Sequence, residues 1–406
     1  MPNDSADLAV LGAAPAFLEP IHVGRPNLGH RAKFLARIET MLDRRYLTNS
    51  GPFEREFEGR IAEMLGVRHC VAMSNATVAL EIAIRALELS GEVIVPSFTF
   101  VATAHALQWQ QITPVFCDID PHTHNIDPEK IEALITPRTT GILAVHLWGR
   151  PCPIETLQKV AEAHGLVLLF DAAHAFGCRH GARHIGGFGR AEVLSFHATK
   201  FISAGEGGAV VTDDDVLAER MQLMKNFGFA GYDNVISIGT NGKMNELSAA
   251  LGLTHLESLE EFAKINRTHF FAYDEHLTGI PGVSLLQYRA EQSPNYQYVV
   301  AEVEESSLGL GRDELVSVLH AENILARRYF YPGVHRMEPY RSLFPNAGEH
   351  LPATKALAER VLVLPTGTGV TTADVTKICA VIRAAATRQS AVRAALAQRS
   401  ERVLTA

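Results

Sequence analysis

One lysine and one aspartate have the clearest potential for chemistry in this sequence. Asp171 ends the apolar, strand-like run 166–171, and Lys200 stands 29 residues later, between the strand-like segments 193–196 and 207–211. Side chains at the carboxyl ends of strands usually line the ligand crevice of an α/β sheet. An amine can form a Schiff base with a carbonyl compound, and a carboxylate can keep a heterocyclic nitrogen protonated. The pair therefore predicts covalent amine chemistry.

Three motifs around this pair resemble those of the DegT/StrS family of sugar-nucleotide aminotransferases, which depend on pyridoxal 5'-phosphate. They are Asp-Ala-Ala-His-Ala-Phe-Gly at 171–177, Ser-Phe-His-Ala-Thr-Lys at 195–200 and Gly-Thr-Asn-Gly-Lys-Met-Asn-Glu at 239–246. The resemblance covers about residues 49–366. Segments 226–229 and 329–335 are similar to those of the 4-aminotransferases in desosamine-type dideoxyaminosugar pathways.

The resemblance implies a role for each matching residue of the cofactor site. Lys200 forms the Schiff base and then moves the proton between substrate carbon and cofactor, while Asp171 pairs with the pyridine nitrogen. Ser195 holds the cofactor phosphate together with Ala76 and Thr77, which open a predicted helix whose free N–H groups favour an anion. Phe100 stacks on the pyridine ring, although Phe98 is a credible alternative.

Further residues are implied to contact the cofactor or the substrate. His174 stands where many relatives carry a glutamine near the ring hydroxyl of the cofactor. Asn241 reaches the cofactor phosphate of a neighbouring subunit, which implies a homodimer with shared active sites. Lys243, His335 and Asn49 are expected at the substrate, although Lys243 could equally be a solvated surface residue.

Composition narrows the classes of partner. The 406-residue chain has a formal charge of −8, which provides no basic field for nucleic acid. Its five cysteines form no Cys-x-x-Cys pair, and no apolar run approaches the length of a membrane span. We expect a cytoplasmic enzyme with reduced thiols and no membrane partner. The histidines at 122, 124, 180 and 184 lack further ligands at suitable spacing, so we expect no metal site.

The order of predicted elements gives the domain organisation. Strands of four to six residues alternate with helices from 67 to 171, which predicts a mainly parallel sheet covered on both faces. Helices are expected at 31–47, 312–322 and from 372, and a long helical pattern at 251–262 leads out of the first domain. We expect an N-terminal arm at 1–28, a large cofactor-binding domain at 29–262, a smaller C-terminal α/β domain at 263–390 and a tail at 391–406. The family resemblance makes this the aspartate aminotransferase-like fold type I, with seven strands in the large sheet.

The expected reaction is transfer of an amino group from L-glutamate to a keto-sugar nucleotide. The resemblance favours dTDP-4-keto-6-deoxyglucose, giving dTDP-4-amino-4,6-dideoxyglucose. A 3-aminotransferase acting on a dTDP-3-keto-6-deoxyhexose would use the same cofactor residues and stays open. Lys200 argues against the sugar dehydratase branch, in which histidine replaces the lysine. A regulatory relative that binds cofactor or sugar nucleotide without turnover is the alternative from another class.

Overall fold

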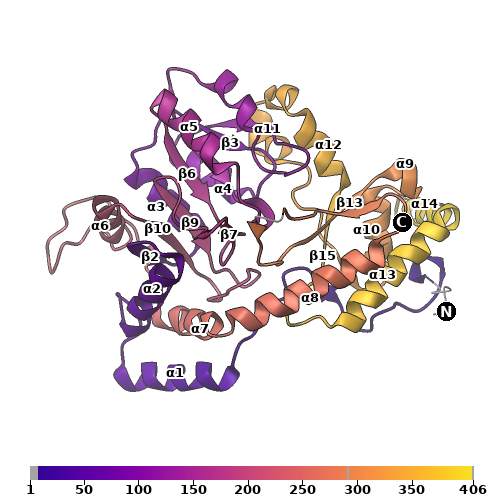
Figure 1. Cartoon of the computed structure of the whole chain (residues 1–406), viewed down its shortest axis with the longest axis horizontal. Helices are drawn as coiled ribbons and strands as arrows, with labels where there is room; N and C mark the ends of the chain where they lie inside the picture. Colours follow the sequence, from indigo (N-terminus) through magenta and orange to yellow (C-terminus); the bar gives the residue numbers. More distant parts are fainter. Residues whose placement is uncertain (1–7, 290–291, 405–406) are drawn as a thin grey trace.

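The computed structural model describes residues 8–289 and 292–404 and contains two domains (Figure 1). A seven-stranded sheet forms the centre of the larger domain, in the order β2-β10-β9-β6-β5-β3-β4. Only β10 runs antiparallel to its neighbours, so the expected mainly parallel sheet of seven strands is confirmed. The strands are β2 (His69–Met73), β3 (Glu92–Pro96), β4 (Thr113–Cys117), β5 (Thr139–Val145), β6 (Val167–Asp171), β9 (Ala191–Ser195) and β10 (Gly208–Thr212).

Helices cover both faces of this sheet, as the nearly continuous apolar strands require. One face packs with residues of α2 (Pro52–Leu65), α5 (Ile154–His164) and α7 (Glu246–Leu256). The other face packs with α3 (Ala76–Ala86), α4 (Ala102–Gln108) and α6 (Asp215–Met224). The carboxyl ends of the parallel strands remain available for a ligand.

The smaller domain is built on the antiparallel sheet β11-β13-β15 and its own apolar core. Its strands are β11 (Val283–Leu285), β13 (Val299–Val303) and β15 (Val361–Leu364). Helices α9 (Glu305–Leu308), α10 (Arg312–Ala321), α13 (Thr372–Thr387) and α14 (Gln389–Leu404) pack in this core. Helix α11 (Tyr340–Leu343) packs on the large domain through Tyr340, and α12 (Pro352–Arg360) packs between the two domains through Leu357. A short three-stranded sheet, β12 (Gln292–Ser293), β7 (Arg179–His180) and β8 (Arg183–His184), joins the two domains.

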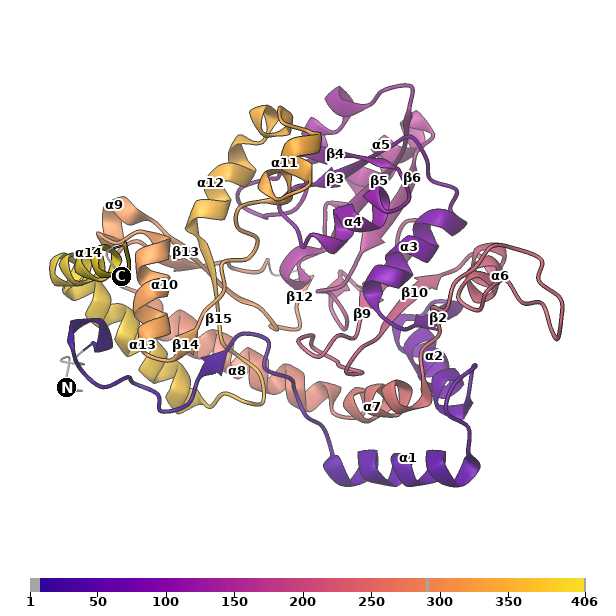
Figure 2. The ribbon, with the colours of Figure 1, turned by 180° about the vertical axis from the view of Figure 1, so that it is seen from behind.

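The N-terminal segment belongs to the core of the small domain from Leu8 onward. Leu8, Phe17 and Ile21 are buried there, and β1 (Ile21–His22) pairs in parallel with β14 (Ile324–Leu325). The Glu322 carboxylate accepts hydrogen bonds from the backbone N–H groups of Ala9 and Ala16, at 2.6 and 2.7 Å. Figure 2 shows this segment running beside β14 before it crosses to α1 (Arg31–Arg44). Residues 1–7 of the predicted arm lie outside the described residues.

Two helix predictions differ from the structure. The pattern at 251–262 is divided between α7, which ends at Leu256, and α8 (Leu259–Leu277). Helix α8 packs on the large-domain core through Phe262 and on the small-domain core through Phe270, so it connects both cores. The first helix ends at Arg44 rather than at 47, because Arg45 takes a left-handed conformation with φ of 50°.

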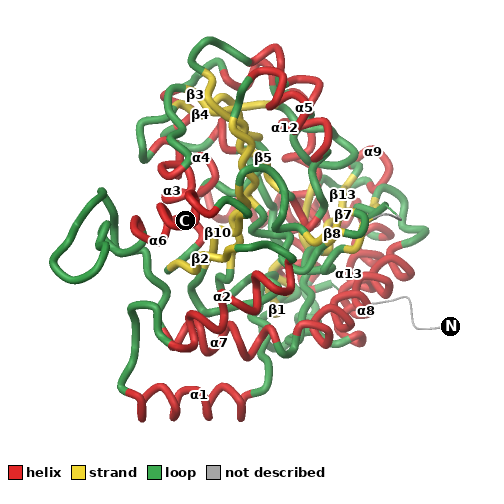
Figure 3. Tube along the Cα trace, turned by 60° about the vertical axis from the view of Figure 1, so that its left-hand side comes forward, coloured by secondary structure: helices red, strands yellow, loops and turns green. Residues whose placement is uncertain are grey.

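Two segments extend beyond the packed body of the chain. Figure 3 shows α1 alongside α7 at the outer edge, and a long loop that projects after α6. This projecting loop, residues 226–240, carries several exposed apolar side chains: Phe227, Phe229, Tyr232, Val235, Ile236 and Ile238. None of the helices within the described residues is both long and apolar enough to span a membrane.

Candidate active site

A cavity of about 720 Å³ lies at the carboxyl ends of the parallel strands and brings Asp171 and Lys200 together. Its walls come from both domains. The large domain contributes the first turn of α3, the end of β6 and the segment around Lys200. The small domain contributes Tyr298, Arg327 and Tyr329. The cavity is therefore the place where residues distant in the sequence can act on one ligand.

Asp171 is a buried carboxylate with two defined hydrogen bonds. Its Oδ2 accepts from Thr103 Oγ1 at 2.9 Å, and its Oδ1 accepts from the backbone N–H of Ala173 at 3.0 Å. Burial raises the pKa of this carboxyl, against the lowering effects of those two bonds and of Lys200. A ligand cation beside Asp171 would favour the ionised form. The site thus fits the protonated nitrogen of a ring better than a neutral group.

Lys200 lies in the same cavity without an ion-pair partner within 4 Å among the described residues. Its Nζ donates to Tyr298 Oη at 3.2 Å. Burial lowers the pKa of the ammonium group to about 8, and Asp171 opposes this effect. A lysine with such a lowered pKa is a nucleophile and a proton carrier near neutral pH.

His174 is held as a neutral ring at the cavity wall. Its Nδ1 accepts a hydrogen bond from the backbone N–H of Trp148 at 3.3 Å, and its ring stacks on the Trp148 indole. Burial and the charge of Lys200 hold the pKa of His174 well below its usual range. Because Nδ1 accepts, the proton of the neutral ring is on Nε2. This tautomer can donate to a ring oxygen, as predicted for the cofactor hydroxyl.

The N-terminus of α3 forms a cradle suited to a phosphate. Asn75 caps the helix by accepting from the backbone N–H of Val78, which leaves the first N–H groups, at Ala76 and Thr77, for a ligand. A Cβ on Gly208 would lie 2.5 Å from the nitrogen of Ala76, so glycine is needed for this approach. Ser195 is the register partner of Gly208 on β9 and also lines the cavity. The donor set fits the predicted phosphate end of the cofactor.

Phe100 and Phe98 occupy different environments. Phe100 is 55% exposed and lines the cavity, whereas Phe98 is buried in a core with Trp148 and Phe330. In a regular strand, residues two positions apart point to the same side. Phe98 and Phe100 lie in different environments because the chain turns after β3. Of these two residues, only Phe100 can stack on a ring bound in the cavity.

Four of the predicted residues do not line this cavity within one chain. Asn241 and Asn49 are exposed, and Lys243 donates from Nζ to Asn226 Oδ1 at 3.0 Å. All three lie near the base of the projecting loop or in the turn before α2. Their contacts with cofactor or substrate stay predictions that need a second chain.

His335 is the fourth of these residues. It is 4% exposed, and its Nδ1 lies 2.7 Å from Ser97 Oγ. Burial lowers its pKa to about 4. The structure gives His335 a contact with the segment that follows β3, and its predicted substrate contact stays untested.

The structure adds residues that the sequence did not single out. Tyr298 binds Lys200, Thr103 binds Asp171, and Arg327 brings a guanidinium to the cavity wall, with its Cζ 5.0 Å from the centre of the Tyr329 ring. Tyr298 and Arg327 belong to the small domain, so no local spacing connects them with Lys200. The apolar pattern of the sequence does not single out any of these three residues as a member of the site.

Comparison with known proteins identifies the family. The model of the DegT/DnrJ/EryC1/StrS aminotransferase family matches residues 29–383. The chain is 38% identical over 360 residues to the dTDP-4-amino-4,6-dideoxy-D-glucose transaminase of Escherichia coli, covering 88% of this chain and 96% of the relative. It is 34% identical over 371 residues to the GDP-perosamine synthase of Caulobacter vibrioides, covering 90% and 98%.

A solved structure gives the same result for the fold. The crystal structure of DesI in the presence of its TDP-sugar product is 49% identical to the chain, with a TM-score of 0.90 and coverage of 94% of this chain and 97% of that one. The expected fold class and cofactor dependence are confirmed. The chain belongs to the DegT/DnrJ/EryC1/StrS family and is a pyridoxal-phosphate-dependent aminotransferase.

Proposed function

We propose that this enzyme transfers the amino group of L-glutamate to a dTDP-linked 4-keto-6-deoxyglucose, giving dTDP-4-amino-4,6-dideoxyglucose. The observation that supports this proposal most directly is that the partly buried amine of Lys200 and the buried carboxylate of Asp171 share one cavity, next to a helix N-terminus suited to phosphate. The similarities to a dTDP-sugar transaminase and to DesI with its TDP-sugar product favour this substrate class.

The chain's own groups divide the work of binding and proton transfer. Bound pyridoxal phosphate supplies an electron sink for the carbanion that forms at the amino-bearing carbon. Asp171 keeps the ring nitrogen protonated, and His174 donates from Nε2 to the ring oxygen. The N–H groups of Ala76 and Thr77, together with Ser195, hold the phosphate, while Phe100 covers the ring. These roles are part of the proposal.

Lys200 is proposed to carry the proton. Its amine removes the proton from the carbon that bears the amino group and returns a proton during the second half of the reaction. The Tyr298 hydroxyl, 3.2 Å from Nζ, can orient the amine once it is free. Since the pKa of Lys200 is already lowered by burial, proton transfer in both directions is accessible near neutral pH.

Arg327 is proposed to bind a carboxylate of the glutamate donor. It is a cation on the small-domain wall of the cavity, whereas the α3 cradle proposed for the phosphate belongs to the large-domain wall. Its guanidinium lies over the Tyr329 ring, which limits its orientations. Arginine binds a carboxylate through two parallel hydrogen bonds and so selects a donor of this type.

A homodimer with shared sites is proposed on the basis of exposed apolar surface. The projecting loop and the outward side of α1, with Leu35 and Leu42, expose apolar side chains of the kind that protein interfaces cover. Asn241 and Lys243 close the base of this loop, and Asn49 precedes α2. Docking of the loop on a second copy would bring these residues toward the partner's cavity.

Product analysis tests the proposed reaction. The holoenzyme is incubated with glutamate and, separately, with dTDP-linked 4-keto and 3-keto 6-deoxyhexoses and a GDP-linked 4-keto sugar, and each product is identified by mass and nuclear magnetic resonance. We expect amination of the dTDP-linked 4-keto sugar, and none with a Lys200→Ala control. Amination of only the 3-keto sugar would establish the 3-aminotransferase alternative. No amination of any sugar, with no conversion of glutamate, would favour a binding protein.

A further inference from the structure

A second cavity lies between the two domains, away from the catalytic residues. This interdomain groove has a volume of about 570 Å³. Its large-domain wall is the turn 121–123 with Arg150, and its small-domain wall includes residues 285–287, Arg289, Glu302 and Arg360. No residue lines both this groove and the catalytic cavity. The groove is therefore a separate place where a ligand could contact both domains.

Arg150 is a buried cation at the floor of the groove. It is 4% exposed, and its Nη1 donates to the carbonyl of His122 at 2.8 Å while Nη2 donates to the carbonyl of Gln287. Its Nε has no hydrogen-bond partner, and among the described residues no carboxylate lies within ion-pair distance of the guanidinium. Burial lowers the pKa of Arg150, and Arg289 adds to this effect. A buried charge paired only with neutral carbonyls is costly.

The acidic residues near the groove are already engaged. Asp120 accepts from the backbone N–H groups of His122 and Thr123, at 2.8 and 2.7 Å. Glu302 lies 3.1 Å from His124 Nε2 and 3.1 Å from Arg360 Nη2, so its charge is divided between two partners. Arg289 is exposed at the rim. The three arginines that line the groove thus face a single lining carboxylate.

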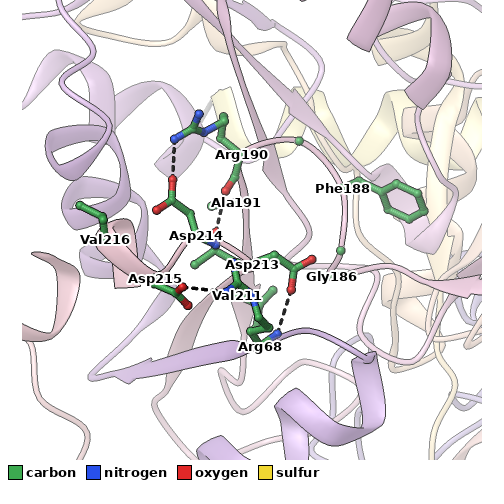
Figure 4. A pocket seen from close by; sticks show the side chains of 13 residues that line it. Arg68, Gly186, Phe188, Arg190, Ala191, Val211, Asp213, Asp214, Asp215 and Val216 are labelled. Atoms are coloured by element: carbon green, nitrogen blue, oxygen red, sulfur yellow. Dashed lines mark hydrogen bonds and ion pairs between the residues drawn. The ribbon is translucent and has the colours of Figure 1, made fainter. Parts of the chain in front are cut away.

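In another arginine-lined pocket, each arginine forms an ion pair with a carboxylate. Figure 4 shows Arg68 and Arg190 with the acidic run 213–215 around them. Arg68 pairs with Asp215 at 2.7 Å, and Arg190 pairs with Asp214 at 2.6 Å. The cations of this pocket have their own carboxylates, whereas Arg150 has none. An anion is therefore expected in the interdomain groove and not in the pocket of Figure 4.

We propose that the interdomain groove binds a small oxyanion, a phosphate or carboxylate group, between Arg289 and Arg360 and above Arg150. Guanidinium groups bind such anions through paired hydrogen bonds. The ligand would join the two domains, because Arg150 and the 121–123 turn belong to one and Arg289 and Arg360 to the other. The stretch that ends in Arg150 also includes Trp148, whose N–H binds His174 in the catalytic cavity. The anion site thus borders the catalytic wall without being part of it.

Calorimetric titration of the holoenzyme tests this site. Inorganic phosphate and, separately, succinate are titrated at constant ionic strength into wild type, into the double variant Arg289→Gln/Arg360→Gln and into the control Arg68→Gln/Arg190→Gln. Both variants remove two surface arginines and lose the same formal charge. Arg150 is kept, because its hydrogen bond to the carbonyl of Gln287 joins the two domains.

We expect the groove variant to bind at least one of the anions about tenfold more weakly, or to lose one binding site per chain, while the control variant matches wild type. An effect limited to phosphate identifies a phosphate site, and one limited to succinate identifies a carboxylate site. Equal affinities in wild type and groove variant for both anions, the absence of binding to wild type, or an equal loss in the control would each overturn the proposal.

Discussion

Two lysines of this chain, the partly buried Lys200 and the buried Lys225, should respond to removal of their amine in opposite ways. Lys200 lies in the catalytic cavity, and burial lowers its pKa from 10.5 to about 8. Lys225 is 1% exposed and donates to Glu54 at 2.8 Å and to Glu58 at 3.0 Å. Burial alone would lower the pKa of Lys225, but the two carboxylates outweigh it and raise the pKa. The charged partners of each lysine therefore decide whether removing its amine stabilises or destabilises the protein.

The size of the stability change expected for Lys200→Met follows from the pKa of Lys200. The difference between 10.5 and about 8 corresponds to about 3 kcal/mol at roughly 1.4 kcal/mol per pH unit. The value of about 8 already includes the attraction of Asp171, but removing the amine also removes its hydrogen bond to Tyr298, which reduces the gain. We expect Lys200→Met to stabilise the cofactor-free protein by about 1–3 kcal/mol at pH 7. Lys225→Met leaves the buried Glu54 and the partly buried Glu58 without their cation and should destabilise the protein by about 3–5 kcal/mol.

The dependence on pH separates a charge effect from a packing effect. Between pH 8 and 10.5 the unfolded chain binds more protons at Lys200 than the folded protein does, so wild type gains about 1.4 kcal/mol per pH unit relative to Lys200→Met. The folded pKa of Lys225 lies above 10.5, so its own contribution is fully present below that pH. Without Lys225 the already raised pKa of Glu54 rises further, so the deficit of Lys225→Met does not shrink as the pH rises from 7 to 9.5.

Urea denaturation of the cofactor-free proteins at pH 7 and 9.5, at one protein concentration, measures these differences. The expected result is an advantage of Lys200→Met that shrinks at pH 9.5, together with a deficit of Lys225→Met that does not shrink. A Lys200→Met protein less stable than wild type at pH 7, or an advantage independent of pH, would refute the assignment of Lys200 as an amine destabilised by partial burial.

Three further predictions concern catalysis. Asp171→Asn should fold and bind cofactor yet lose at least about a hundredfold in turnover, because a neutral side chain no longer favours the protonated ring; near-normal single-turnover rates would show that another group holds the nitrogen. Arg327→Gln should raise KM for glutamate at least about tenfold and leave KM for the sugar nucleotide nearly unchanged, whereas equal effects on both would contradict a donor-specific role. Mixing inactive Lys200→Ala with an inactive Asn241→Trp variant should restore part of the activity once subunit exchange is confirmed with affinity tags, and complete exchange without activity would exclude a contribution of Asn241 across the interface.

The sequence predicted those parts of the site that depend on local order. Asp171 ends a strand and Ala76 begins a helix, and both positions follow from short-range patterns of apolar and polar residues. The order of strands and helices likewise predicted a mainly parallel sheet, whereas the number of seven strands was predicted from the family resemblance. The choice of Phe100 over Phe98 was left open, because either residue could face the core until the chain's path after β3 was known.

What the sequence could not predict depends on packing between distant segments. Tyr298 reaches Lys200 across 98 positions, and Lys225 meets Glu54 across 171. From the sequence, Lys225 would be predicted to be a surface lysine at the end of a helix, yet it is buried beside two carboxylates of α2. The break between α7 and α8 was also missed, because the apolar spacing continues through residues 257 and 258 without a proline or glycine.

The contrast between the two lysines also explains why, among the described residues, no carboxylate lies at ion-pair distance from Lys200, although Asp171 and Glu206 both line the cavity. With a pKa of about 8, roughly one tenth of the Lys200 amine is neutral at pH 7, compared with about 0.03% at the ordinary value of 10.5. A second acid beside it would create the environment of Lys225, where the raised pKa keeps the amine charged. Asp171 alone is compatible with a neutral amine, and it is held toward other partners by Thr103 and by the backbone of Ala173. Nucleophilic chemistry at Lys200 therefore depends on keeping carboxylates near the amine but outside ion-pair distance of it.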